Sequence, residues 1–186
     1  MLPMGYLFKR VAPKSDWLNA PVVERIFSLS GCISENFADY VDYWKHNGFW
    51  LFDSPAIIRE LARENGISLD GLTLFYYEVY ELQYESEPGE PGRWTEFEPW
   101  AFPTAVEIPD NGALEGFDVV SFWCGNAPEH SPLSCNGLAE KIRTNRNCLL
   151  QSLEVARDAL NAGRFEHSEP GPYRIIAVYT VPDVHA

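Results

Sequence analysis

Two short apolar segments near the C-terminus constrain the fold most. Residues 117–123 and 173–181 carry valine, isoleucine and aromatic side chains at alternating and adjacent positions, a pattern typical of strands that are covered on both faces. Between them, 147–162 places leucine and alanine at helical spacing and is followed by Gly163, which predicts a helix with one apolar face. We therefore predict that both strands lie in one sheet, with 117–123 as a central strand, and that the helix packs on this sheet.

The rest of the chain adds strands and helices but no second core. Apolar and aromatic runs predict strands at 5–12, 72–84 and 93–100, and the last two are joined by a turn rich in proline and glycine. Helices are predicted at 34–48 and at 55–65. The second helix has the clearer boundaries, because Ser54 can cap its start, Pro55 suits its first position and Gly66 suits its end. We predict a single α+β domain over residues 1–186, a mainly antiparallel sheet with helices packed on it.

Acidic residues dominate the charge of the chain. The 186 residues carry a net charge of −13, and between Glu78 and Asp118 eleven acidic residues face a single basic one, Arg93. Such a field repels nucleic acid and anionic lipid and speeds encounter with basic proteins. The N-terminus shows no signal peptide, no apolar run is long enough to cross a bilayer, and four cysteines are too few for a disulfide scaffold. We expect a protein of the reducing cytoplasm.

The acidic region also contains aromatic residues, the combination that interfaces with basic proteins use. The alternative is that the acids serve only solubility. The residues predicted to contact a partner are Glu78, Glu81, Glu85, Glu87, Glu90, Trp94, Glu96, Glu98 and Trp100.

A loop at 124–137 concentrates cysteine, histidine and proline. If a helix starts just after Cys135, its N-terminus would activate this thiol as a nucleophile, with His130 as the base. Ser134 or Asn136 acting as a helix cap explains the same residues without chemistry. Cys124, His130, Cys135 and Cys148 could also supply four zinc ligands, but they lack the short cysteine spacing that zinc sites use. We expect reduced, buried thiols, no metal and no cofactor.

A second candidate for acid–base chemistry lies at His167 and Glu169, just before Pro170. The alternative is a solvated loop that joins the helix to the last strand. Two prolines around Gly171 make the segment rigid and would hold Glu169 and His167 in a defined place beside the 124–137 loop. The hydrolase and nucleotide motifs G-x-S-x-G, Walker A and G-x-G-x-x-G are absent from the sequence.

Several short strings in the C-terminal third carry a resemblance: Gly116-Phe-Asp-Val-Val, Ser131-Pro-Leu-Ser-Cys-Asn-Gly-Leu-Ala-Glu, Asn147-Cys-Leu-Leu and Phe165-x-x-Ser-Glu-Pro-Gly-Pro-Tyr-Arg. Residues 114–181 resemble small acidic bacterial proteins of the kind found among polymorphic-toxin immunity proteins. The resemblance implies a cytosolic binding protein that neutralises a toxin. Our leading hypothesis is such a binding module with a basic protein partner, and the alternative is a small enzyme that uses Cys135 and His130, or His167 and Glu169.

Overall fold

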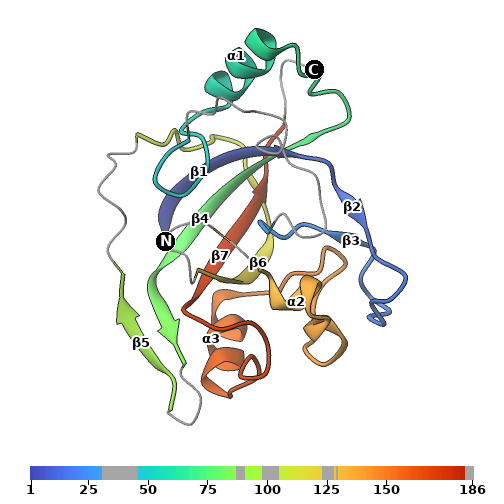
Figure 1. Cartoon of the computed structure of the whole chain (residues 1–186), viewed down its shortest axis with the longest axis vertical. Helices are drawn as coiled ribbons and strands as arrows, with labels where there is room; N and C mark the ends of the chain where they lie inside the picture. The colour runs from blue at the N-terminus through green and yellow to red at the C-terminus, as the bar shows by residue number, and fades with distance from the viewer. Residues whose placement is uncertain (31–45, 87–90, 98–104, 123–127, 129, 183–186) are drawn as a thin grey trace.

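The computed structural model describes residues 1–30, 46–86, 91–97, 105–122, 128 and 130–182 (Figure 1). The elements in chain order are β1 (Leu2–Lys9), β2 (Ala12–Pro13), β3 (Arg25–Ile26), α1 (Pro55–Asn65), β4 (Thr73–Glu85), β5 (Arg93–Glu96), β6 (Ala113–Ser121), α2 (Pro132–Cys135), the 3-10 turn η2 (Leu138–Glu140), α3 (Leu153–Asn161) and β7 (Tyr173–Thr180). Antiparallel strands with helices packed on them confirm the predicted α+β class. None of the helices in these ranges is long and apolar enough to span a membrane.

The main sheet has five antiparallel strands, in the order β1-β4-β7-β6, with β5 paired to β4. The predicted strands 117–123 and 173–181 are neighbours in it, with Phe117 opposite Ala177. Their placement in one sheet is therefore confirmed. The central position predicted for 117–123 is wrong, because β6 ends the strand order. It is buried on both faces because segments outside the sheet cover it.

Two apolar clusters, one beside each face of β7, fill the core. Ile175 packs with Val119 and with Leu160 of α3, whereas Ile176 and Val178 pack with side chains of β1, β4 and the 25–30 segment. Figure 1 shows α3 at one end of the sheet and α1 at the other. Because both faces of β7 are covered, its sequence is apolar at consecutive positions rather than alternating.

Helix α1 begins and ends where the sequence predicts. The Ser54 hydroxyl accepts a hydrogen bond from the backbone N–H of Ile57, and Pro55 occupies the first helical position. Gly66 ends the helix with φ 66°, a conformation that glycine adopts without strain. The buried face consists of Ile58, Leu61 and Ala62.

The helix predicted at 147–162 starts six residues later, at Leu153. Ser152 caps it by accepting from the Val155 N–H at 3.3 Å. The segment before this cap turns at Asn147 and Cys148, where Cys148 has φ 62°, and Leu150 then forms an isolated bridge with Phe117 of β6. The prediction is wrong at this boundary because the leucines of 147–151 cover the outer side of β6. Most of the helix predicted at 34–48 lies outside the described residues.

Candidate functional site

The hairpin of β4 and β5 confirms the predicted pairing of 72–84 with 93–100, but it turns its aromatic side chains inward. Tyr84 and Phe97 are buried. The Trp94 ring meets Tyr84 and Tyr80 edge-on at 5.1 and 5.8 Å. Its indole N–H donates to the side-chain oxygen of Asn161, at the end of α3, at 2.8 Å. Trp94, Tyr84 and Tyr80 pack the hairpin onto α3, and Trp94 and Tyr80 remain half-buried.

The acidic residues of the hairpin fall into two groups. Glu85 accepts two hydrogen bonds from the Arg93 guanidinium, at 2.9 and 3.0 Å, which hold the pKa of this carboxyl below its ordinary value. Glu81 and Glu96 are exposed. The other predicted contact residues, Glu87, Glu90, Glu98 and Trp100, lie outside the described residues.

Glu78 belongs to a different part of the sheet, which we call the tyrosine face: Tyr6 of β1 and Tyr76 of β4, whose side chains are buried, and Tyr179 of β7, which is half-buried. The three rings form a row, with centroids 5.1 Å apart for Tyr6 and Tyr76 and 5.6 Å apart for Tyr76 and Tyr179. The Glu78 carboxylate accepts from the Tyr76 hydroxyl at 3.3 Å and from the Tyr179 hydroxyl at 3.0 Å. Leu114, opposite Tyr179 in the ladder, shares this side of the sheet and is 50% exposed.

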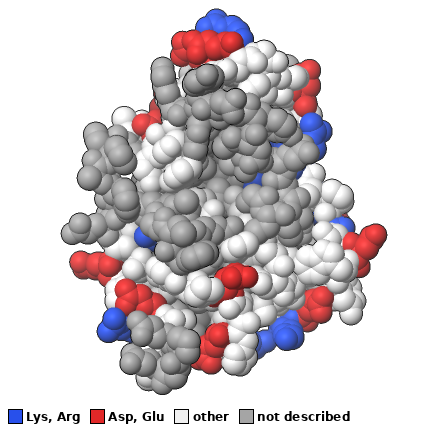
Figure 2. Space-filling view, viewed as in Figure 1, with Lys and Arg blue, Asp and Glu red and all other residues white. Residues whose placement is uncertain are grey.

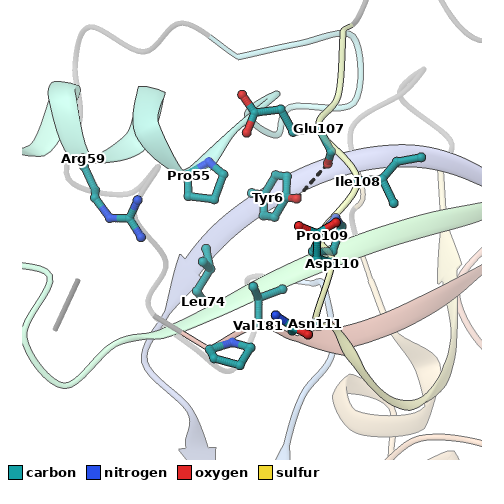
Figure 3. Close-up of a pocket in the computed structure, with 11 residues that line it drawn as sticks. Tyr6, Pro55, Arg59, Leu74, Glu107, Ile108, Pro109, Asp110, Asn111 and Val181 are labelled. Atoms are coloured by element: carbon teal, nitrogen blue, oxygen red, sulfur yellow. Dashed lines mark hydrogen bonds between the residues drawn. The ribbon is translucent and has the colours of Figure 1, made fainter. Parts of the chain in front are cut away.

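A loop that we call the acidic strap, residues 105–112, borders the tyrosine face. The Tyr6 hydroxyl donates to the backbone carbonyl of Glu107 at 2.7 Å, as Figure 3 shows. Asp53, just before α1, fixes the other side of the strap: its carboxylate accepts from the Ala105 N–H at 3.1 Å, and its carbonyl accepts from the Glu107 N–H at 2.9 Å. Glu107 and Asp110 are exposed on this strap, and Ile108 between them is 69% exposed.

The tyrosine hydroxyls stay protonated near neutral pH. Burial, together with the negative charges of Glu107 and Asp110, raises the pKa of Tyr6 to about 12. Burial and the hydrogen bond to Glu78 raise the pKa of Tyr179 to about 12. Each hydroxyl therefore acts as a fixed donor that holds a carboxylate or a carbonyl in place.

Between the tyrosine face, the strap and α1 the surface forms a cleft of about 280 Å³. Its apolar lining comes from all three parts and includes Leu74, Val181, Pro55 and Pro109. Two carboxylates from the strap and Arg59 from α1 add charge at its rim, and Figure 3 shows Arg59 on the side away from Asp110. This arrangement can hold an elongated ligand with an apolar body and a charged end.

The 124–137 loop does not provide the helix start predicted after Cys135. Pro132 opens α2 and Cys135 is its last residue, so the thiol is not at a helix N-terminus. Its sulfur lies 3.5 Å from the Ser30 hydroxyl oxygen. The main chain of His130 is held by β6: its carbonyl accepts from the Ser121 N–H at 2.9 Å. The helix boundary was misjudged because Pro132, which suits the first position of a helix, moves the start before the cysteine.

The predicted placement of Glu169 beside this loop is confirmed. Its carboxylate accepts from the Asn136 side chain at 3.2 Å, and the Tyr173 hydroxyl donates to the carbonyls of Glu169 and Phe165. His167, two residues earlier, is exposed. These contacts explain how Glu169 is held beside the loop.

Sequence reasoning missed a buried polar cluster around Asp118 of β6. Asp118 has no exposed surface, and its carboxylate accepts from the Ser131 hydroxyl at 2.6 Å and from the Val119 N–H at 2.9 Å. Burial raises its pKa to about 6 against these hydrogen bonds and the charge of Lys9. The buried Lys9 ammonium donates to the carbonyls of Ser28 and Ser30. The sequence feature that could have indicated this cluster is the single acidic residue within the apolar run 117–123.

The described residues hold no group of three or more histidine, cysteine or acidic side chains placed to bind a metal ion. Cys124, one of the four conceivable zinc ligands, lies outside them. Cys135 and Cys148 are not in a disulfide, and burial raises the pKa of Cys148 to about 12, so this thiol stays protonated. Comparison with protein-family models, curated proteins and solved structures found no match to this chain.

Proposed function

We propose that this chain is a protein-binding module that captures a basic protein partner through the acidic strap and the exposed side chains beside the tyrosine face. The observation that carries the proposal is the composition of this surface. The exposed carboxylates of Glu107 and Asp110 lie on the strap on either side of the exposed Ile108 in sequence, next to a cleft, and Leu114 just after the strap is also exposed. Apolar anchors inside a charged rim are the usual anatomy of a protein interface.

The distribution of charge over the molecule supports this choice of surface. On the face shown in Figure 2, acidic and basic side chains both occur around the rim, and the described residues form no large field of one sign there. The strap brings Glu107 and Asp110 to the cleft, with Arg59 on the side away from Asp110 (Figure 3). The net charge of −13 adds long-range attraction for a basic partner.

We further propose that the partner is a toxin and that the module is an immunity protein of the cytoplasm. The resemblance of residues 114–181 to polymorphic-toxin immunity proteins supports this class of partner. Direct binding is the mode that suits the surface, because a strap held in place by hydrogen bonds to Tyr6 and Asp53 can cover a basic active site without chemistry of its own.

The test is co-expression with candidate toxins. Genes beside the one that encodes this chain should be inspected for a large secreted protein with a variable C-terminal domain, and that domain should be co-expressed with the chain. The proposal expects restored growth and a complex that survives purification at low salt. A toxic domain that this chain neither binds nor silences would count against the immunity role.

A matched set of variants locates the contact. Replacing Glu107 and Asp110 by lysine should abolish protection, whereas Cys135→Ala and His130→Ala should leave it intact. The opposite result, loss of protection in the cysteine and histidine variants with retention in the charge-reversed one, would favour the enzyme hypothesis and overturn the binding surface.

A further inference from the structure

The cleft beside the acidic strap is small. Its volume of about 280 Å³ lies at the lower end of the range of roughly 300–1,000 Å³ that small-molecule and cofactor sites occupy. It is large enough to receive one long side chain from a partner protein.

The lining selects the chemistry of that side chain. Leu74, Val181 and the ring of Tyr6 provide an apolar floor, and the strap contributes Glu107 and Asp110 at one rim. Lysine and arginine combine an apolar stem with a cationic end, and such side chains bury the stem while the charge stays at the surface. A neutral apolar side chain would leave the two carboxylates without a counter-charge.

Arg59 sets the direction in which such a side chain enters. It lines the cleft from α1, and Figure 3 shows it on the side away from Asp110. Like charges repel, so a cation is disfavoured near α1 and favoured at the strap. An acidic side chain would need the reverse orientation, and it would meet two carboxylates against one guanidinium.

We propose that the cleft is a receptor for one lysine or arginine side chain of the basic partner, whose cationic end lies between Glu107 and Asp110. This inference rests on the proposed function and adds to it the kind of residue that anchors the complex. This proposal places the main contact with the partner at the cleft and not at the β4–β5 hairpin.

Capped tripeptides test the cleft without the partner. The probes are Gly-Lys-Gly and Gly-Arg-Gly, with Gly-norleucine-Gly and Gly-Glu-Gly as controls, titrated into the labelled full chain and followed by the methyl NMR signals of Leu74, Ile108 and Val181. Basic probes should shift these signals saturably, with dissociation constants in the millimolar range that a single side chain allows. Equal binding of the norleucine probe, or tighter binding of the glutamate probe, would overturn the proposal.

Two double variants with the same change in charge separate local recognition from general attraction. Glu107→Gln with Asp110→Asn should weaken the lysine probe about fivefold or more, the scale of two exposed charge contacts. Glu81→Gln with Glu96→Gln, on the exposed hairpin, should change its affinity less than about twofold. Equal losses in both variants would mean that the peptide senses only net charge, and the proposal would fail.

The same variants distinguish failure of this inference from failure of the proposed function. If the basic probes do not bind but the Glu107 and Asp110 variant loses a verified partner, the surface is an interface without a side-chain receptor. If the probes bind as expected and no basic partner is captured, the receptor stands and the proposed role is wrong.

Discussion

Asp118 is a buried carboxyl on an apolar strand, and its environment favours the neutral form. Three hydrogen bonds and the charge of Lys9 act to lower its pKa, yet burial outweighs them and raises the pKa from 3.8 to about 6. Because the folded protein holds this proton more tightly than the unfolded chain, ionisation of Asp118 opposes folding. Stability is therefore highest below the ordinary pKa and falls as the pH rises through about 6.

Substituting Asp118 by asparagine should remove this pH dependence. The difference in free energy of unfolding between wild type and Asp118→Asn should move by about 2 kcal/mol in favour of the wild type as the pH falls from about 7 to about 4. Urea denaturation of both proteins at several pH values measures it. Titration of all other groups cancels in the difference, so parallel stability curves would contradict the assignment.

Asp53 is the residue that fixes the acidic strap. Its side chain accepts from the Ala105 N–H and from the Asn47 side chain, at 3.1 and 2.9 Å. Asp53→Ala should lose both bonds, lower stability by about 1–2 kcal/mol and accelerate amide exchange at 105–107. Asp53→Asn, which keeps one acceptor oxygen, should have a smaller effect. Hydrogen exchange read by mass spectrometry tests this, and unchanged exchange in the alanine variant would show that the strap is held by other contacts.

At the scale of elements, helix ends that are set by neighbouring residues could be predicted from the sequence. Segments that bridge a distant strand could not. The ends of α1 could be predicted because its caps, Ser54 and Gly66, lie beside the helix in sequence. The start of α3 could not, because 147–150 is drawn into a bridge with Phe117, a contact set by the sheet. The candidate site follows the same rule. Glu78 was predicted as a contact residue, but the strap meets Tyr6 across 101 positions of sequence, and no local pattern encodes that approach.

Both outer strands of the β1-β4-β7-β6 order are crossed by a short segment at a glycine. Phe52 bridges β1 next to Gly5, and Leu150 bridges β6 next to Gly116. These glycines have φ of 133° and 144°, and each lies at a register shift of the ladder. An added Cβ would lie 2.6 Å from the Phe52 carbonyl oxygen or 2.7 Å from that of Leu150. The crossing segments cover strand edges that would otherwise be open to pairing with another chain.

Gly5→Ala and Gly116→Ala should therefore each destabilise the protein by about 2 kcal/mol or more, because a positive φ and a clash with backbone act together. Gly66→Ala is the matched control: φ is 66° there, but nothing lies within 4 Å of the added Cβ. Its cost should be about 1 kcal/mol, the conformational part alone. Thermal or urea denaturation of the three variants gives the comparison. Equal losses of stability at all three positions would show that the crossing segments move away from the added Cβ without cost.

At the scale of the whole molecule, the proposed function assigns separate roles to charge and shape. The net charge of −13 would attract a basic partner from any direction, whereas the strap and the cleft would define one place of contact. Of the aromatic contact residues predicted on the hairpin, Trp94 is engaged with α3. The hairpin retains exposed Glu81 and Glu96, so it can contribute to steering without forming the contact.

Two charge-reversed pairs test this division with a partner that the chain is shown to bind. Glu107→Lys with Asp110→Lys, and Glu81→Lys with Glu96→Lys, alter the net charge equally. Stopped-flow kinetics over a series of salt concentrations should show slower association for both pairs, by roughly tenfold at low salt, because both weaken the long-range field. Only the strap pair should also accelerate dissociation, since contacts that persist in the complex determine that rate. If only the hairpin pair dissociates faster, the contact lies on β4 and β5, as the sequence alone predicted. Unchanged association and dissociation rates in both pairs would show that these acidic residues serve only solubility.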